Sequence, residues 1–330
     1  MIPVGEPHLR VSTYSHAGAG GEQNEDRYAV QGYELNDVAG TGSVFAIVAD
    51  GVGDQRAGER AAEIAVHTIL QSVGQSDASQ PTAILQAAII QASQTILAQS
   101  ESQPELAGMG STCLCAWVVG RRLYMASVGN SRLYLLRKNT LQQLNMAYEL
   151  EQEDEKSPKG KAKHEARRGY IGGRKALDID MRLVLRRGSE RNAERNQGAR
   201  LEPNDRLLLC SDGLSDALSE AEIIEMLGGH RIEFAAEALV NAALKKGAPG
   251  NLTALVLGVP PARPTPTTRR MRLRKVLVLS MATVTLLVIS LLGWYFWGQW
   301  LDAGGGPRPT PIATLTAQPA PTSQPTLAAE

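Results

Sequence analysis

One long apolar segment constrains this chain more than any other feature. Residues 276–297 read VLVLSMATVTLLVISLLGWYFW, which is 22 residues without a charged side chain. A helix of this length spans about 33 Å, close to the roughly 30 Å hydrocarbon core of a bilayer. Because a helix in a globular core is rarely apolar on every face over such a length, the sequence predicts a transmembrane helix over residues 276–298.

The residues on either side of this segment indicate its orientation. Residues 261–275 form a basic juxtamembrane linker, with six positive charges and no negative charge between residues 263 and 275. Positive charge beside a span favours the cytoplasmic side, so we expect a single-pass protein of the cell membrane with residues 1–260 in the cytoplasm. Residues 299–330 are rich in Pro, Thr and Ala, and we expect a disordered tail on the outer side.

Charge and cysteine content exclude several classes of function. The chain has 34 basic and 34 acidic residues, but residues 263–330 hold seven of the basic and two of the acidic ones. The remaining 262 residues therefore have a net charge of −5, which argues against nucleic acid as a partner. The three cysteines, Cys113, Cys115 and Cys210, lack zinc-ligand spacing and are too few for a disulfide framework, so we interpret them as buried apolar residues.

Short apolar runs and amphipathic helices fill residues 1–260. We expect strands at residues 9–16, 27–31, 43–50, 112–119, 121–128, 132–137, 206–211 and 252–259. We expect helices at residues 56–73, 82–98, 219–229 and 234–245, of which the third opens with a capping box. This order favours an α+β sandwich of mostly antiparallel sheets over a doubly wound fold. Residues 145–170 contain an acidic block followed by a basic block, and we interpret them as a solvated insertion loop.

Three acidic clusters stand where apolar strands end. They are Asn24-Glu25-Asp26, Asp50-Gly51 and Ser211-Asp212-Gly213. Carboxylates at the ends of rigid strands, beside a glycine that allows close approach, suit a hard cation such as Mg²⁺ or Mn²⁺. The sequence contains no histidine cluster that competes as a ligand set. Asp-Gly also forms ordinary turns, and each cluster taken alone is open to that simpler interpretation.

The clusters and three further motifs resemble a known family. Six segments of this chain resemble, in order, the motifs of the metal-dependent protein serine/threonine phosphatases (PPM, or protein phosphatase type 2C) in their bacterial form. The segments are NED at 24–26, ADGVG at 49–53, GMGST at 108–112, VGNSRLYLLR at 128–137, CSDGLSD at 210–216 and GNLTALV at 250–256. The resemblance implies a PPM-type phosphatase-like domain over residues 1–260, a four-layer αββα sandwich followed by the transmembrane helix. It also implies a two-metal cleft in which an activated hydroxide hydrolyses phosphoserine or phosphothreonine esters.

The resemblance implies roles for individual positions. Asp50 resembles the aspartate that bridges both metal ions, and the carbonyl of Gly51 would be a further ligand. Glu25 would bind the second ion, Asp212 the first, and Asp26 would hold a metal-bound water. Two Mn²⁺ or Mg²⁺ ions are therefore implied as cofactors, with Asp50 and Asp26 as the catalytic residues.

Several positions depart from the family pattern. Gly21 stands where the family usually has an arginine that grips the substrate phosphate, a loss of charge-assisted hydrogen bonds of about 1.5–3 kcal/mol. Asn130 and Gly250 stand where the family has aspartates that bind an additional metal ion and the first metal ion. Asp54 replaces a glycine of the D-G-x-G-G motif and is a candidate to reach inward in compensation.

The residues leave two functions open. The first is a membrane-anchored phosphatase of reduced activity that acts on cytoplasmic phosphoproteins, with a Ser/Thr kinase as a candidate partner. The second is a pseudophosphatase that keeps the fold and binds or regulates phosphoproteins. The four retained carboxylates favour the enzyme, and the substituted positions Gly21, Asn130 and Gly250 favour the binding module.

Overall fold

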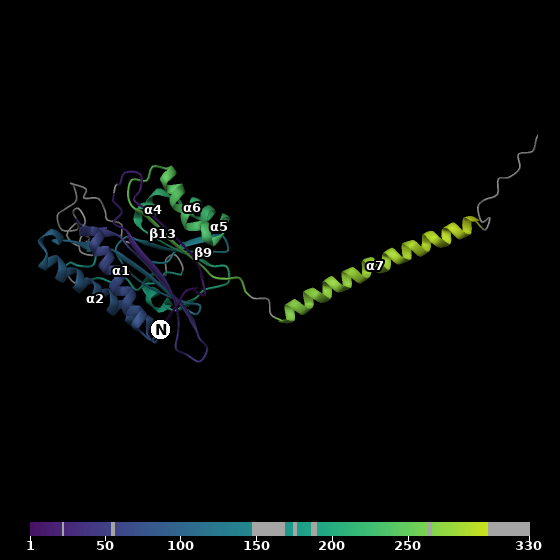
Figure 1. Cartoon of the computed structure of the whole chain (residues 1–330), viewed down its shortest axis with the longest axis horizontal. Coiled ribbons are helices and arrows are strands. Elements are labelled where there is room, and N and C mark those ends of the chain that lie inside the picture. The colour runs from purple at the N-terminus through teal and green to yellow at the C-terminus, as the bar shows by residue number, and fades with distance from the viewer. Residues whose placement is uncertain are drawn as a thin grey trace, which may run out of the picture. The chain divides into compact units, whose positions relative to one another are not determined.

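The computed structural model describes residues 1–21, 23–53, 57–146, 169–173, 177–185, 190–262 and 266–302. The chain divides into two compact units, Met1–Ala262 and Arg263–Glu330, which Figure 1 shows along one chain. The first unit contains the sheets, and the second contains one long helix. Asp54, the centre of the expected insertion loop (147–168) and the expected C-terminal tail from residue 303 lie outside the described residues.

Two antiparallel sheets form the middle of the first unit. The larger sheet contains, in spatial order, β1 (Ile2–Val4), β3 (Arg27–Glu34), β4 (Gly42–Ala49), β7 (Cys113–Val119), β8 (Arg122–Val128) and β11 (Ala199–Arg200). The smaller sheet contains β10 (Thr140–Gln143), β9 (Arg132–Arg137), β12 (Arg206–Cys210), β13 (Leu252–Gly258) and β2 (Arg10–His16). A short ribbon pairs β5 (Gly51–Val52) with β6 (Gly110–Ser111).

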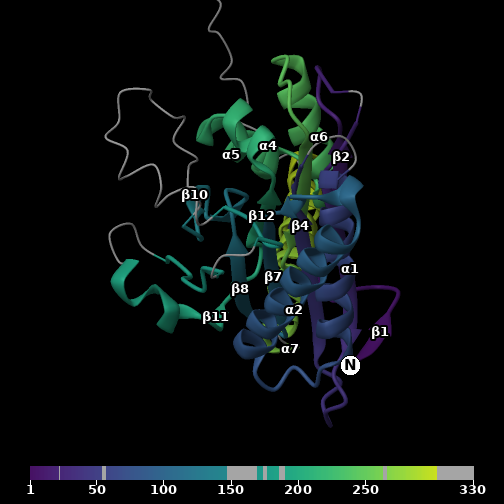
Figure 2. The same ribbon diagram turned by 90° about the vertical axis from the view of Figure 1, so that its left-hand side faces the viewer.

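Helices cover the outer face of each sheet. On the larger sheet these are α1 (Ala57–Gln75) and α2 (Pro81–Ser102). On the smaller sheet they are α4 (Asp212–Ala217), α5 (Glu220–Gly229) and α6 (Ile232–Lys245). Figures 1 and 2 show the two helical layers on opposite sides of the strands. The predicted four-layer αββα sandwich is therefore confirmed.

The alternation of side chains along β4 explains why the sheets stack in this way. Val44, Ala46 and Val48 point into the core between the two sheets, where leucines of β9, β12 and β13 meet them. Phe45 and Ile47 point the other way, against α1 and α2. Because neighbouring residues of a strand face opposite sides, one fully apolar strand supplies both cores at once.

The ribbon of β5 and β6 continues the ladder of β4 and β7 without a change of register. Val48 pairs with Leu114, and three residues further along each strand Gly51 pairs with Ser111. The row of side chains that faces the inter-sheet core therefore runs from Val48 through Asp50 to Val52. A carboxylate thus follows directly on the buried apolar row, at the end of the sandwich.

Every strand and helix expected from the sequence is present, with shifted ends. The structure extends the strand from residue 27 to Glu34 and the helix near residue 82 to Ser102. The capping box of the third expected helix is formed, because the Ser219 hydroxyl accepts from the Glu222 amide while the Glu222 carboxylate accepts from the Ser219 amide. The three cysteines are buried and unpaired, as interpreted from the sequence.

Several elements were not predicted. These are β1, β5, β6, β10, β11, α4 and the short helical turns Pro104–Leu106 and Glu190–Asn196. All are brief, and the missed strands of the larger sheet lie at its edges, where pairing with one neighbour shapes the chain more than an apolar pattern does.

The second unit contains helix α7, Pro266–Asp302. Within it, Ser280–Trp300 is an apolar stretch of 21 residues with a mean hydropathy of 1.6, long and apolar enough to cross a membrane. Its side chains are exposed, including those of Trp294 and Trp300. The helix starts ten residues before the predicted span, so residues 266–275 of the expected linker are helical.

Candidate metal centre

Four carboxylates from both sheets gather at one end of the sandwich. Glu25 and Asp26 directly precede β3, and Asp50 directly follows β4 in the larger sheet. Asp212 is the first residue of α4, separated by one residue from the end of β12 of the smaller sheet. Asp50 interacts electrostatically with the other three carboxylates, which places all four in one neighbourhood. The family resemblance implied this grouping.

Asp50 is held by its backbone. Its N–H donates to the Thr112 hydroxyl at 2.9 Å, and its carbonyl accepts the Thr112 N–H at 2.8 Å. The Ser111 hydroxyl adds a third bond to the same carbonyl at 3.1 Å. At Gly51 a Cβ would lie 2.1 Å from the carbonyl oxygen of Gly58 in α1, so this contact between strand and helix requires glycine.

The loop that carries Glu25 is fixed by Asn251, at the start of β13. The Asn251 side-chain oxygen accepts the Glu25 N–H at 2.9 Å. Its amide nitrogen donates to the carbonyls of Ala17 at 3.2 Å and Gln23 at 3.1 Å. One side chain from the last strand therefore sets the position of the first acidic loop.

Asp26 is 2% exposed and only half satisfied. One carboxylate oxygen, Oδ2, accepts from the Ser211 hydroxyl at 2.7 Å, and Ser211 is oriented by the Thr253 N–H at 3.0 Å. The other oxygen, Oδ1, has no hydrogen-bond partner of ordinary geometry among the described residues. Burial raises the pKa of Asp26 to about 6, and the charge of Asp212 adds to this rise, while Ser211, Thr253 and Arg27 partly oppose it.

The other three carboxylates also have raised pKa values. Burial first, and then the charges of the other carboxylates, raise the pKa of Asp50 to about 8. Burial is the main cause for Glu25, followed by repulsion from Glu59, and burial is the main cause for Asp212. Groups that raise one another's pKa in this way are stabilised by any cation that lies among them.

The donor set fits a hard divalent cation. All candidate ligands are oxygens, and the buried Oδ1 of Asp26 is an acceptor with no donor among the described residues. Glu25, Asp50, Asp212 and the Gly51 carbonyl are the groups that would hold two Mg²⁺ or Mn²⁺ ions. Within the described residues, no three acidic, His or Cys side chains converge as tightly as the ligands of one closed site.

One substituted position, Asn130, lies at this centre, and another, Gly250, has open space around it. The Asn130 amide nitrogen donates to Oδ2 of Asp212 at 2.5 Å, so one oxygen of that candidate ligand is already engaged. At Gly250 a Cβ would meet no described atom within 4 Å, and a longer side chain has room there. Space therefore does not exclude a carboxylate side chain at position 250.

Gly21 differs sharply from Gly250. A Cβ at Gly21 would lie 2.5 Å from the Ala17 carbonyl oxygen, closer than real Cβ contacts. The neighbouring Gly18 has a φ of +83° and packs onto the carbonyl of Gly250. This loop is folded tightly against the end of the domain, and its backbone does not accept an arginine at position 21.

The sequence analysis missed two residues of this centre. Ser211 was named only as part of a motif, although its buried hydroxyl is the donor to Asp26. Arg27 donates to the Asn24 carbonyl at 2.9 Å and to the Asp26 carbonyl at 2.8 Å, and forms an ion pair with Glu59. Its position directly after the acidic cluster was the available signal. Thr112 has a structural part, since its hydroxyl and its N–H both bond to the backbone of Asp50.

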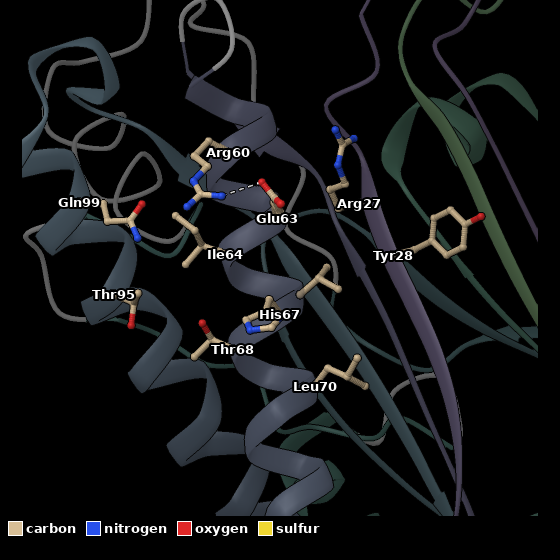
Figure 3. Close-up of a pocket in the computed structure, with 11 residues that line it drawn as sticks. Arg27, Tyr28, Arg60, Glu63, Ile64, His67, Thr68, Leu70, Thr95 and Gln99 are labelled. Atoms are coloured by element: carbon tan, nitrogen blue, oxygen red, sulfur yellow. Dashed lines mark hydrogen bonds and ion pairs between the residues drawn. The ribbon is translucent and has the colours of Figure 1, made fainter. Parts of the chain in front are cut away.

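A separate groove of about 510 Å³ runs beside α1 (Figure 3). Arg27 and Tyr28 of β3 and Thr95 and Gln99 of α2 line it, together with His67 and other residues of α1, which lies between them. None of the four carboxylates borders it. The ion pair of Arg60 and Glu63, drawn in Figure 3, crosses its surface at 2.9 Å. The four carboxylates therefore do not line this groove.

Comparison with known proteins defines the class. The family described as Protein phosphatase 2C matches residues 14–247 of the chain, which contain all four carboxylates. The chain belongs to the protein phosphatase 2C family.

Individual relatives narrow this class to its bacterial members. Residues of this chain are 31% identical over 222 positions to serine/threonine protein phosphatase PstP of Mycobacterium tuberculosis, covering 66% of this chain and 41% of that protein. They are 32% identical over 220 positions to serine/threonine phosphatase stp of Listeria monocytogenes, covering 64% of this chain and 82% of that protein. The chain thus matches less than half of the mycobacterial relative's length.

A solved structure shares both fold and sequence with this chain. It is the catalytic domain of PstP in complex with two manganese ions, with 29% identity and a TM-score of 0.58. The match covers 76% of this chain and 98% of that domain.

Proposed function

We propose that this protein is a serine/threonine protein phosphatase that hydrolyses phosphoserine and phosphothreonine esters with two divalent cations. The observation that carries the proposal is the convergence of four carboxylates from both sheets, one of them with a buried oxygen that lacks a donor among the described residues. Family membership supports the reaction class, and the oxygen-only donor set supports Mn²⁺ or Mg²⁺.

Each residue of the centre has a defined part in this proposal. Asp50, Glu25, Asp212 and the carbonyl of Gly51 would hold the two ions. Bound cations of this kind supply an acidified water and neutralise the charge that develops on a phosphoryl group. Asp26, which is buried and accepts the Ser211 hydroxyl, would hold a water in the centre and accept a proton from it.

We further propose that α7 anchors the protein in the cell membrane. The exposed apolar stretch Ser280–Trp300 supports a span, and the basic residues before it support a cytoplasmic location of residues 1–260. The substrates would then be cytoplasmic phosphoproteins, including those phosphorylated by a partner Ser/Thr kinase. The C-terminal residues would lie outside the cell.

Turnover by the full chain in detergent tests the enzymatic proposal. We expect Mn²⁺-dependent hydrolysis of p-nitrophenyl phosphate and of a phosphothreonine peptide, and its loss in Asp50→Asn. Glu63→Gln, which alters a carboxylate on the outer face of α1, is the matched control and should keep the activity. Hydrolysis that survives in Asp50→Asn would show that another site carries it.

A cysteine placed in the tail tests the orientation. Ala313→Cys, in a chain whose three native cysteines are replaced by serine, should react with a membrane-impermeant maleimide in intact cells. Reaction only after lysis would reverse the proposed topology and with it the compartment of the substrates.

A second function, a pseudophosphatase that binds phosphoproteins without turnover, is favoured by one observation. The amide of Asn130 donates to Asp212 at 2.5 Å, which engages an oxygen that a metal ion would use. In that case the full chain would bind a phosphothreonine peptide and release no phosphate at any Mn²⁺ concentration.

A further inference from the structure

Two exposed apolar side chains lie directly beyond the acidic centre. Val52 is 42% exposed although it is paired in β5, and Tyr170, directly before the bridge of Ile171 to Ser111, is 41% exposed. Val52 is the last residue of β5, and Tyr170 lies in the segment 169–173, far away in the sequence. Exposed apolar groups beside a polar centre often mark a surface that contacts a ligand.

The backbone brings these two side chains together on one face. Val52 pairs directly with Gly110, so a side chain at position 110 would stand beside that of Val52. A Cβ on Gly110 would lie 2.2 Å from Cδ2 of Tyr170. The tyrosine ring therefore occupies the place of the missing side chain, next to Val52. Only glycine at position 110 permits this arrangement.

The segment that carries Tyr170 is anchored firmly. Ile171, fully buried, exchanges two backbone hydrogen bonds with Ser111 at 2.8 and 3.1 Å. The N–H of Gly172 donates to the Ser93 hydroxyl of α2 at 3.0 Å. Because Ile171 points inward, alternation turns Tyr170 outward, and the ring has a fixed position relative to β6.

The register then sets the distance from this apolar pair to the acidic centre. Asp50 and Val52 belong to the same row of side chains, two residues apart. Two residues along a strand span about 6.6 Å. In an extended peptide, side chains two positions apart also point to the same side with about that spacing.

We propose that Val52 and Tyr170 form an apolar shelf that binds a Leu-like side chain two positions from the phosphorylated residue of a substrate. This inference rests on the proposed function, since it takes the phosphate to lie at the carboxylates. The shelf makes the affinity for a phosphopeptide depend on a residue near the phosphorylated one, whereas the phosphate group is the same in every substrate. Its occupant is an extended phosphopeptide with an aliphatic residue at position −2 or +2.

Binding of paired peptides to the full chain in detergent with Mn²⁺ tests the shelf. Both peptides carry a non-hydrolysable phosphonate analogue of phosphothreonine, and they differ only in having Leu or Ser at positions −2 and +2. Fluorescence anisotropy should give a Kd about fivefold lower for the Leu peptide, as expected for partial burial of a leucine. Peptides without the phosphonate correct for uptake by the micelle.

Substitutions then locate the preference. In Val52→Ser and in Tyr170→Ser the ratio of the two Kd values should fall towards one, whereas Tyr170→Phe should retain it. Val38→Ser is the matched control, since Val38 is fully exposed in the turn before the opposite end of β4 and its substitution should leave the ratio unchanged. An equal Kd for both peptides, absence of binding, or a ratio that survives both serine variants overturns the shelf.

This experiment separates the shelf from the proposed activity, because it needs no turnover. A chain that hydrolyses p-nitrophenyl phosphate but binds both peptides equally would be a phosphatase without the shelf. A chain that prefers the Leu peptide without hydrolysing any phosphate would keep the shelf as part of a phosphoprotein-binding module.

Discussion

Two buried aspartates in this molecule have similar exposure and opposite surroundings. Asp205, 1% exposed, lies at the turn before β12 and accepts from Arg137 through Nε at 2.9 Å and Nη2 at 2.5 Å. The Glu202 N–H adds a bond at 2.6 Å. Asp26, 2% exposed, receives the Ser211 hydroxyl on one oxygen and no comparable donor on the other within the described residues.

The difference shows at which buried carboxylate the protein supplies a neutralising side chain of its own. At Asp205 a guanidinium is supplied, and the pKa of Arg137 rises because of that bond. At Asp26 and Asp50 the neighbours are further carboxylates, and burial with repulsion raises both pKa values. At Asp205 the cation is a side chain of the protein itself. At Asp26 and Asp50 the negative charges remain uncompensated by such a side chain, so this centre is suited to accept a cation from solution.

Removing the Arg137 guanidinium should have the largest effect on stability. Arg137→Met leaves Asp205 buried without its partner, and we expect a loss of about 3 kcal/mol in the free energy of unfolding, the lower end for buried pairs because Arg137 is one-third exposed. Urea denaturation of the full chain measures it. Arg60→Met, at an exposed pair with Glu63, is the control and should change stability by less than about 0.5 kcal/mol.

Removing a charge from the acidic centre should act in the opposite direction. Asp50→Asn relieves repulsion among the four carboxylates, and we expect the metal-free protein to gain about 2 kcal/mol in stability. The same variant should lose the rise in Tm that Mn²⁺ produces in the wild type. Differential scanning calorimetry with and without Mn²⁺ measures both. A metal-free Asn variant that is less stable than the wild type would contradict the comparison.

Adding a carboxylate should strengthen the acidic centre. Gly250 has open space around its Cβ position, and in Gly250→Asp we expect Mn²⁺ to bind about tenfold more tightly, since a hard cation gains an anionic oxygen. Isothermal titration calorimetry measures the affinity. Gly229→Asp adds the same charge at another open glycine, in α5, and should not change it. Equal affinities in both variants would mean that position 250 does not face the metal.

Substitution of His8, a partly buried side chain with one bonded and one unbonded ring nitrogen, should have the smallest effect on stability. Its Nε2 donates to the Gly120 carbonyl at 2.7 Å, and its buried Nδ1 has no partner among the described residues. Burial lowers the pKa of His8 below 6.5, so the folded state binds fewer protons than the unfolded state. Its contribution is present above pH 6.5 and is lost as pH falls below that value.

The change should amount to less than about 1 kcal/mol, because the ring is partly exposed. Comparison of Tm values for the wild type and His8→Gln between pH 8 and pH 5 isolates it. The glutamine keeps a donor for the Gly120 carbonyl and does not titrate, so the wild type should lose more stability on acidification. Parallel curves would assign the pH dependence to other groups.

The positions of Asp50 and Asp212 near the ends of buried strands could be predicted, because the pattern that marks a strand end is local. The apolar run before Asp50 and that before Asp212 each end in a carboxylate followed by glycine, and both patterns are local. The register that aligns Val52 with Gly110 was not predictable, because it depends on pairing between segments nearly 60 residues apart. Gly21 could be named as a missing arginine, but its contact with the Ala17 carbonyl is a property of the folded loop alone.

The bonds of Asn251 have a consequence for how the protein is made. Asn251 joins the last strand to the Glu25 loop across 226 residues, and β2 pairs with β13 along its whole length. Contacts so distant in sequence form slowly and only after both partners have been synthesised. During translation the helices α1 and α2 can form early, whereas the acidic centre is assembled only once residue 253 has left the ribosome, just before the apolar helix α7 follows. A nascent chain is thus without its centre for most of its synthesis.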